Sequence, residues 1–336
     1  MDERRVGLTI PLEGVPLAES IVPMAQLAEE AGYTDIWSAE VGGTDGLTVL
    51  AAVAAATERL RLGTAILPVF SRPPALMAMS AASLQSLSGG RFVLGLGTST
   101  SIIVGGWMGS EFRRPYTRMS ETVGFLREAL AGKKVNFEGQ TFRSSGFRLT
   151  ADPGSPVPIY VAALGPKMLA LAGEQADGVI LYLFTPEGAG EAVEEVRRAA
   201  ERAGRDPDSI DVVARIPVAL DEDEEAVRFF MRRLTASYAM VDVYNASLTR
   251  QGFGDEVAMI TRLWRSGDRE GAAEAVTDEM LEGLYVFGDL VECTRRLEEF
   301  RRAGVKTPVL FPASVVGDPQ ERLERVRSSV VALAGV

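Results

Sequence analysis

Two carboxylates that follow apolar runs are the candidate catalytic groups of this sequence. Glu13 follows the run Val6–Ile10, and Glu40 follows the run Thr34–Trp37. The chain has no histidine, so a carboxylate, a tyrosine, a lysine, a backbone group or water must carry any proton that the chemistry requires. Each carboxylate also has a simpler interpretation, because Glu13 fits a solvated loop charge and Glu40 fits a surface or helix-capping carboxylate.

Two loops of small residues could bind a phosphate. GLGTSTS spans residues 95–101, and ALGPKM spans residues 163–168. Small side chains let backbone N–H groups and hydroxyls approach an anion, and Gly165 and Pro166 open a predicted helix whose positive end favours one. A tight turn explains either loop by itself. On adjacent strands, the two loops together predict one phosphate site.

The composition excludes several classes of function. A formal net charge of −11 argues against nucleic acid and anionic membrane surfaces as partners. One cysteine, Cys293, and no histidine argue against a catalytic transition metal and exclude an intrachain disulfide. Cys293 itself fits a core position in a helix. No run reaches ~18 apolar residues and no apolar signal segment precedes Val6, so we expect a cytoplasmic protein that acts on a small molecule.

Eight short apolar runs alternate with helical patterns along the chain. This alternation predicts an α/β fold, a closed (β/α)8 TIM barrel, in preference to an open sheet. The barrel is expected to form a single domain over residues 1–336. The predicted strands are Val6–Ile10, Thr34–Trp37, Arg61–Leu67, Phe92–Leu96, Val157–Ala162, Gly178–Tyr182, Ile210–Pro217 and Thr307–Phe311.

Two stretches interrupt this alternation and are predicted to be insertions. The first, after strand four, covers about residues 101–156 and contains a hairpin in Val135–Leu149. The second, between strands seven and eight, covers about residues 221–300 and is largely helical, with one helix expected over Arg269–Leu284. Near the start of the chain, Ser20 is expected to be the N-cap of the first helix.

Aromatic and sulfur-containing residues in the first insertion could shape a substrate pocket. Trp107, Met108 and Tyr116 are the candidates, although side chains of this kind also serve simple packing. Arg113, Arg114 and Arg118 lie near them in the sequence. They could form a basic rim, or they could be ordinary residues at a helix start.

Four motifs, in this order, carry a resemblance to a known family. They are WSAEVGGTDG, LGTAILPVFSRPP, SGGRFVLGLGTS and YVAALGPKMLALAGEQADGVI. The sequence resembles the luciferase-like flavin and deazaflavin oxidoreductases, most closely the branch that uses coenzyme F420. The likeness extends from about Val6 to Ala313. Residues 278–305, DEMLEGLYVFGDLVECTRRLEEFRRAGV, are similar to the methylene-tetrahydromethanopterin reductase type within that family.

The resemblance implies a cofactor site at the C-terminal ends of the strands. It implies a bulge after strand three, with a non-prolyl cis peptide between Ala65 and Ile66 against the face of the deazaflavin. Relatives often have an Asp-His pair where this chain has Ala39-Glu40, so Glu40 is the substitute, either hydrogen-bonded to the ring or donating a proton. The cofactor-binding residues carried over are Trp37, Glu40, Ala65, Ile66, Thr98, Ser99, Ala163, Leu164, Gly165 and Lys167.

The function implied by the resemblance is F420-dependent hydride transfer between C5 of the deazaflavin and an electrophilic carbon of a small substrate. An FMN-dependent monooxygenase on the same barrel is the alternative. The absence of histidine counts against it, because many such enzymes use a pocket histidine. A non-catalytic flavin-binding relative is a third possibility. A homodimer is common in the family and is expected here.

Overall fold

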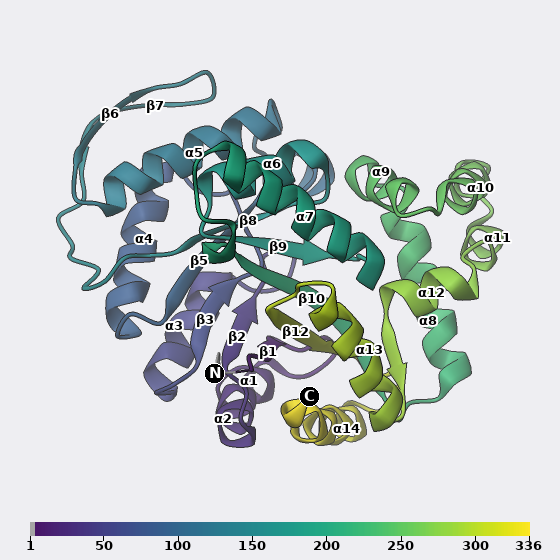
Figure 1. Ribbon diagram of the computed structural model, residues 1–336. Helices are drawn as coiled ribbons and strands as arrows, with labels where there is room; N and C mark the ends of the chain where they lie inside the picture. The colour runs from purple at the N-terminus through teal and green to yellow at the C-terminus, as the bar shows by residue number, and fades with distance from the viewer. Residues whose placement is uncertain (1–3) are drawn as a thin grey trace.

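The computed structural model describes residues 4–336 and contains a closed parallel barrel (Figure 1). The order around the barrel is β1-β2-β3-β5-β8-β9-β10-β12, and β12 pairs with β1 to close it. The predicted barrel is therefore confirmed. Its strands are β1 (Gly7–Thr9), β2 (Asp35–Ser38), β3 (Arg61–Thr64), β5 (Phe92–Gly97), β8 (Ile159–Ala162), β9 (Gly178–Tyr182), β10 (Asp211–Leu220) and β12 (Thr307–Pro312).

Helices cover the outside of the barrel, and one follows each strand in turn. After β1 the chain forms a short helix, α1 (Leu17–Ser20), before the longer α2. The apolar faces of these helices and the outward side chains of the strands form one continuous core. The main surrounding helices are α2 (Val22–Ala31), α3 (Gly46–Ala56), α4 (Pro74–Leu87), α5 (Pro115–Leu130), α6 (Pro166–Gln175), α7 (Pro186–Arg202), α13 (Leu290–Arg302) and α14 (Pro319–Ala332).

The inside of the barrel is filled by inward side chains in layers, as expected for this architecture. The middle layer is apolar and forms a cluster separate from the outer core; its buried members are Trp37, Ala65, Val93, Tyr160, Ile180, Val213 and Val309. Side chains point alternately in and out along a strand, so Asp211 lies below Val213 in β10 and Arg215 lies above it. The barrel interior is therefore charged at both ends and apolar between them.

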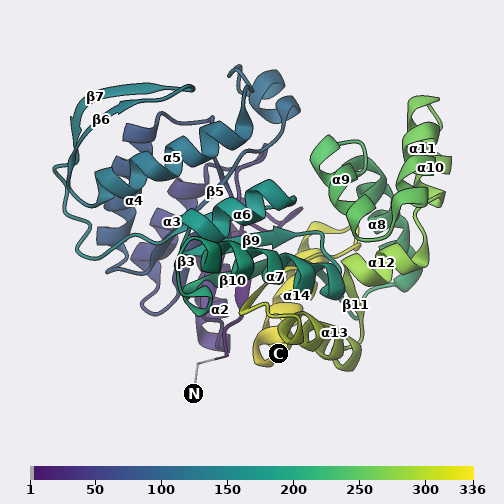
Figure 2. The same cartoon turned by 45° about the horizontal axis from the view of Figure 1, so that its top comes forward.

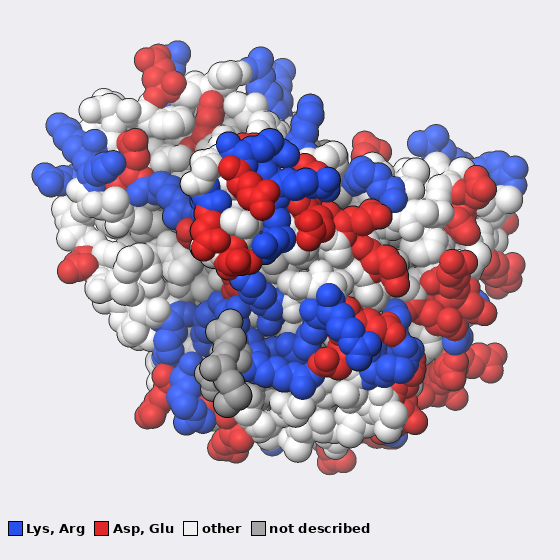
Figure 3. Space-filling view, viewed as in Figure 1, with Lys and Arg blue, Asp and Glu red and all other residues white. Residues whose placement is uncertain are grey.

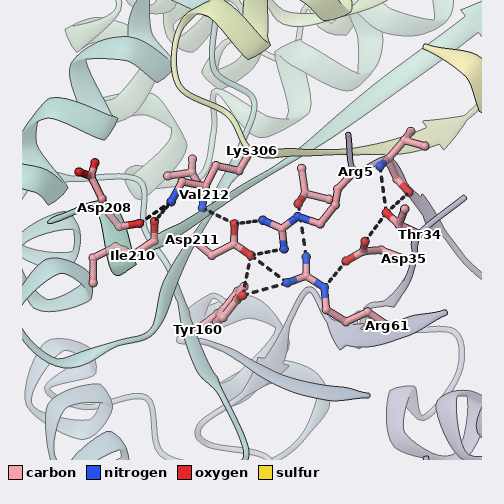
Figure 4. Close-up of polar contacts among 12 residues, drawn as sticks. Arg5, Thr34, Asp35, Arg61, Tyr160, Asp208, Ile210, Asp211, Val212 and Lys306 are labelled. Atoms are coloured by element: carbon pink, nitrogen blue, oxygen red, sulfur yellow. Dashed lines mark hydrogen bonds and ion pairs between the residues drawn. The ribbon is translucent and has the colours of Figure 1, made fainter. Parts of the chain in front are cut away.

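A network of ion pairs closes the N-terminal end of the barrel (Figure 4). Arg61, the first residue of β3, pairs with Asp35 of β2 and with Asp211 of β10. Arg5 donates two hydrogen bonds to Asp211, at 3.0 and 2.6 Å, and the Tyr160 hydroxyl donates a third at 2.6 Å. These charges lie at the starts of the strands, so they stabilise the barrel away from its C-terminal mouth.

The insertion after β5 begins with a single π-helical turn, η1 (Ile102–Trp107), and continues through α5 to a hairpin. The predicted hairpin is confirmed as β6 (Lys134–Glu138) paired antiparallel with β7 (Arg143–Arg148). In Figure 1 it projects from the barrel above α4 and α5. Its apolar side packs on α5, where Phe125 contacts three phenylalanines of the hairpin.

A helical lobe stands beside the barrel between β10 and α13 (Figure 2). Its own core contains Met231, Leu248, Ile260, Met280 and Tyr285. Acidic side chains gather on this lobe in Figure 3. Its helices are α8 (Glu224–Tyr238), α9 (Asp242–Arg250), α10 (Gly254–Arg265), α11 (Arg269–Glu274) and α12 (Asp278–Leu284). The short strand β11 (Val286–Gly288) follows them and pairs in parallel with β10.

Some local expectations were wrong. Ser20 is not an N-cap, because the chain already turns into α1 after Pro16, and α2 has no side-chain cap. The expected helix Arg269–Leu284 is two helices, since Thr277 caps α12 with its own hydroxyl. The lobe ends before α13, which packs between β10 and β12 and belongs to the ring of barrel helices. No helix within residues 4–336 is long and apolar enough to span a membrane.

Candidate active site

Glu40 lies just beyond β2 at the C-terminal mouth of the barrel and is 8% exposed. Its Oε1 accepts a hydrogen bond from the backbone N–H of Gly46 at 3.1 Å, and its Oε2 accepts one from Arg72 at 2.7 Å. Its backbone N–H donates to the carbonyl of Ile66 at 3.2 Å. Both carboxylate oxygens therefore accept hydrogen bonds from donors that the protein holds in place. This arrangement suits an ionised acceptor better than a proton donor.

Arg72 is the cation of this cluster and was not among the residues predicted from the sequence. It pairs with Glu40 and with Asp45, whose side chain caps α3 by accepting from Thr48 N at 2.7 Å. The hydrogen bond to Glu40 is the main cause that raises the pKa of Arg72 above its usual value. A hollow of about 430 Å³ opens beside the cluster, lined by residues of the loop after β2 together with Ser71, Met108 and Ser110.

The chain after β3 forms a shelf inside the barrel mouth. The peptide between Ala65 and Ile66 is cis, which confirms this expectation, and pairing resumes in the short strand β4 (Leu67–Pro68). Ala65 is buried, while Ile66 is partly exposed and packs on the interior cluster. Gly97 of β5 lies so close that an added Cβ would be 2.4 Å from Ile66 Cγ1. The absence of a side chain at Gly97 fixes the position of this shelf.

The loop after β5 places two hydroxyls next to this shelf. Thr98 and Ser99 follow Gly97 directly, and both are partly exposed. Ser99 has a φ of 57°, in the left-handed region, so the chain turns sharply at this residue. Thr100 then accepts a hydrogen bond from Ile103 N at 3.3 Å and starts η1. The hydroxyls of the loop therefore lie at the mouth, as the sequence predicted.

The N-terminus of α6, after β8, is an uncapped helix end. Gly165 occupies the N-cap position and provides no side-chain hydrogen bond. Pro166 has no N–H and the Met168 N–H donates to the Gly165 carbonyl at 3.0 Å, so the Lys167 N–H is the backbone donor of this turn that is left for a ligand. Arg250, from α9 of the lobe, donates to the carbonyl of Leu164, and its guanidinium would be 3.4 Å from a Cβ at Gly165. Lys167 is exposed in the same turn. This end of α6 is therefore strongly electropositive.

Some predicted site residues occupy other environments. Trp37 is fully buried, its ring lies over Arg61, and a Cβ on Gly63 would come within 2.3 Å of it. Trp37 thus fills the barrel interior and has no surface to offer a cofactor. Ala163 is buried, and its N–H donates to the carbonyl of Ile180 at 3.1 Å. Glu13 is exposed in the loop after β1.

The predicted pocket residues of the insertion are only partly brought together. Trp107 is 63% exposed, and its ring would be 3.2 Å from a Cβ at Gly42, in the loop after β2. Met108 lines the same hollow as Glu40. Tyr116 is 40% exposed in the first turn of α5. The η1 turn therefore covers the loop after β2.

The predicted basic rim does not form as one surface. Arg113 is exposed and pairs with Glu111, whereas Arg118 is partly buried and donates to the carbonyl of Val69 at 3.0 Å. Burial lowers the pKa of Arg118. Arg118 instead stacks on Phe142, with its guanidinium carbon 4.9 Å from the ring centre. It holds the hairpin against the barrel.

The profile of the luciferase-like monooxygenase family matches residues 9–307. This chain belongs to that family. The match covers six of the eight barrel strands in full, the last residue of β1 and the first residue of β12, together with both insertions. The predicted recognition is therefore confirmed.

Two of the similar proteins are named as dependent on F420. The chain is 31% identical to a 5,10-methylenetetrahydromethanopterin reductase of Methanolobus tindarius, over 94% of this chain and 97% of that protein. It is 35% identical to an F420-dependent glucose-6-phosphate dehydrogenase of Nocardia farcinica, over 61% of this chain and 66% of that protein. The solved structure of the coenzyme F420-dependent tetrahydromethanopterin reductase of Methanopyrus kandleri matches with a TM-score of 0.79 and 27% identity, covering 97% of this chain and 99% of that one.

Proposed function

We propose that this chain is a coenzyme F420-dependent oxidoreductase that transfers a hydride between C5 of the deazaflavin and an electrophilic carbon of a small organic substrate. The carbon would belong to a C=N, C=C or C=O group. Membership of the family and the F420-dependent relatives support the cofactor. The single observation that carries the proposal is the electropositive end of α6, which lies beside the hydroxyl-bearing loop after β5 at the barrel mouth.

This donor set fits the phosphate of the cofactor. A phosphate needs several N–H and O–H donors and positive charge, and a helix N-terminus supplies both. The start of α6, which follows β8, supplies the uncapped helix end at Gly165 and the ammonium of Lys167. The lobe supplies the guanidinium of Arg250. Thr98 and Ser99 add hydroxyls from the neighbouring β5. We propose that these residues, with the backbone of Leu164, hold the phosphate.

The ring system would lie against the shelf of Ala65 and Ile66. When bound, F420 supplies the hydride chemistry at C5, and the protein supplies binding, orientation and exclusion of water. Glu40 lies at the edge of the shelf, because its backbone N–H donates a hydrogen bond to the Ile66 carbonyl. Because each carboxylate oxygen can accept more than one hydrogen bond, Glu40 can still accept one from a polar ring edge. The sequence left two roles open for Glu40, a hydrogen bond to the ring or donation of a proton. We assign it the first, as a hydrogen-bond acceptor.

The substrate would bind over the face of the ring that the shelf leaves open. The lobe and the η1 turn lie on either side of the mouth, and Trp107 and Met108 are proposed to line the entrance from the η1 side. Tyr116 remains a proposed pocket residue at its outer rim. Exposed Glu13 makes no side-chain hydrogen bond or ion pair with any residue in 4–336, so we do not assign it a catalytic role. We also propose that the chain forms a homodimer and acts in the cytoplasm.

Anaerobic turnover tests this proposal. Protein loaded with reduced F420 would be mixed with a panel of imines, enones and carbonyl compounds, and deazaflavin reoxidation followed by its absorbance. Substrate-dependent reoxidation without oxygen supports hydride transfer. Oxygen uptake with FMN, and no anaerobic turnover with F420, would instead assign the chain to the monooxygenases. Tight F420 binding with no turnover of any compound would indicate a non-catalytic relative.

A further inference from the structure

Two arginines of the barrel strands within residues 4–336 project into the barrel interior, and they differ in their partners. Arg61, at the N-terminal end, pairs with Asp35 and Asp211. Arg215, in the C-terminal layer of β10, has no acidic side chain within 4.0 Å anywhere in residues 4–336. A partly buried cation normally requires an anion or several acceptors. Arg215 therefore has charge that the protein itself does not neutralise.

The side chain of Arg215 is held in a fixed orientation. Its Nε donates to the Thr9 hydroxyl of β1 at 3.2 Å. The guanidinium carbon lies 4.3 Å from the ring centre of Phe311 on β12 and 5.3 Å from that of Tyr182 on β9. Such stacking orients an arginine and keeps its hydrogen-bonding edge available.

The two terminal nitrogens of Arg215 are the groups that remain for a ligand. Within the described chain, neither has a hydrogen-bond partner, and neither is among the fully buried unpaired atoms, so both reach solvent. Nε is already used, which leaves the end of the guanidinium, with its two parallel N–H groups. This edge matches the two oxygens of a carboxylate or a phosphate.

The position of Arg215 indicates that its ligand is the substrate and not the cofactor. Around the barrel, β10 is four strands from β3 in either direction, so Arg215 lies opposite the shelf of Ala65 and Ile66. A ring that rests on the shelf presents its other face to β10. The proposed phosphate site is on β5 and β8, away from Arg215. A group bound at Arg215 would thus belong to a molecule lying over the open face of the ring.

The walls around this position are aromatic. Tyr182 hydrogen-bonds to Tyr238 of α8 with 3.3 Å between the hydroxyls, and Tyr238 packs on Tyr244 of α9 with ring centres 4.7 Å apart. The lobe lies beside β9 and β10 in both ribbon views (Figures 1 and 2). It thereby adds an apolar surface next to the cation.

We propose that Arg215 binds an oxyanion of the substrate, a carboxylate or a phosphate, and that the substrate carries an apolar or aromatic body against Tyr182 and Phe311. This inference rests on the proposed function, since the open face of the ring defines the substrate side. It narrows the substrate class to anionic molecules. It also explains how a chain of net charge −11 attracts such a substrate, because Arg215 is a local positive centre.

Binding of matched probes tests the proposal without turnover. Benzoate and neutral benzamide, which have the same ring and nearly the same shape, would be titrated by calorimetry at low ionic strength, with inorganic phosphate as a third probe. Arg215→Met removes the charge at similar length, and Arg215→Lys keeps the charge but not the planar fork. Arg262→Met, on an exposed face of α10, is the control.

We expect benzoate to bind wild-type protein and Arg262→Met, and to bind Arg215→Met at least about tenfold more weakly. Inorganic phosphate should lose its binding at Arg215 in Arg215→Met and keep its binding at the start of α6. The benzoate affinity of Arg215→Lys should lie between those of wild type and Arg215→Met. The affinity for neutral benzamide should be the same in all of these proteins. The dissociation constant of F420, measured for the same variants, should stay within about threefold of wild type.

Three outcomes would overturn the proposal. The first is no binding of benzoate to wild-type protein. The second is equal benzoate affinity in wild type and Arg215→Met. The third is a loss of F420 affinity in Arg215→Met with benzoate binding intact, which would assign the arginine to the cofactor. If wild-type protein fails to bind F420 but binds benzoate through Arg215, the proposed function fails and the anion site stands.

Discussion

Replacing Asp211 by asparagine should destabilise the barrel substantially. The Asp211 carboxylate accepts hydrogen bonds from Arg61 at 2.8 Å, from Arg5 at 3.0 and 2.6 Å, and from the Tyr160 hydroxyl at 2.6 Å (Figure 4). Asparagine keeps the shape of the side chain but removes its charge. Arg61 then keeps Asp35 as its buried acidic partner, whereas Arg5 keeps no acidic partner within residues 4–336.

The magnitude follows from the ionisation of Asp211. Burial raises the pKa of this carboxyl, but the charges of Arg61 and Arg5 outweigh burial and lower it from 3.8 to about 2. Each pKa unit corresponds to about 1.4 kcal/mol, so ionised Asp211 contributes about 2.5 kcal/mol to the free energy of unfolding at neutral pH. Removing one member of a buried ion pair typically costs about 3–5 kcal/mol. We expect Asp211→Asn to cost about 2–4 kcal/mol.

The effect should depend on pH with a defined sign. The folded pKa of Asp211 lies below the unfolded one, so the stabilisation is fully present above about pH 4 and is lost as the pH falls toward 2. Urea denaturation of wild type and Asp211→Asn, followed by circular dichroism between pH 7 and pH 3, measures the difference. The gap between the two proteins should be widest near neutral pH and should narrow on the acidic side.

Asp208→Asn is the matched control. Asp208 lies three positions before Asp211, is exposed, and pairs with Arg197 at the surface. Surface ion pairs contribute little, so this variant should unfold close to wild type. Equal loss of stability in the two variants would refute the reasoning. So would a stability gap for Asp211→Asn that does not change with pH.

Three further substitutions test the mouth of the barrel. Glu40→Gln should leave the pH profile of turnover unchanged, since Glu40 is an acceptor; loss of an ionisation from the profile would identify it as the proton donor. Gly97→Ala places a Cβ 2.4 Å from Ile66 and should lower the free energy of unfolding by about 1–3 kcal/mol in urea denaturation, whereas Gly106→Ala, where nothing lies within 4 Å, should have little steric effect. Arg250→Gln should weaken F420 binding about tenfold in calorimetry, and less at high salt; an unchanged affinity would remove Arg250 from the phosphate site.

The elements of the fold were predictable because their signals are local. Strands such as Gly178–Tyr182 are short apolar runs that end at turns, and the helix Pro166–Gln175 begins at a proline that follows a glycine. Errors arose where a local signal had a competitor. Ser20 looked like an N-cap, but the chain had already begun a helical turn at Leu17.

The candidate site was predictable only in part. The loops around Thr98 and Gly165 carry their signal in small residues, and they do reach the mouth. Arg72 and Arg250 were missed because their partners, Glu40 and the Leu164 carbonyl, are distant in sequence. An arginine within the apolar run of β10 was the one available signal for Arg215.

Trp37 is a residue that was predicted to be in the site and that the structure places elsewhere. The resemblance to the family implied a cofactor contact for this residue. Alternation along β2 directs its ring into the barrel, where Gly63 leaves room for it. Sequence spacing gives the direction of such a side chain, but the depth at which it packs depends on the opposite strands.

Cofactor affinity tests the central claim most directly. The purified protein would be titrated separately with F420 and with FMN, by fluorescence and by calorimetry. We predict tight binding of F420 and weak binding of FMN, with the F420 affinity falling in Arg250→Gln. Tight binding of FMN alone would contradict the account and favour a monooxygenase, and binding of neither would refute both enzymatic interpretations.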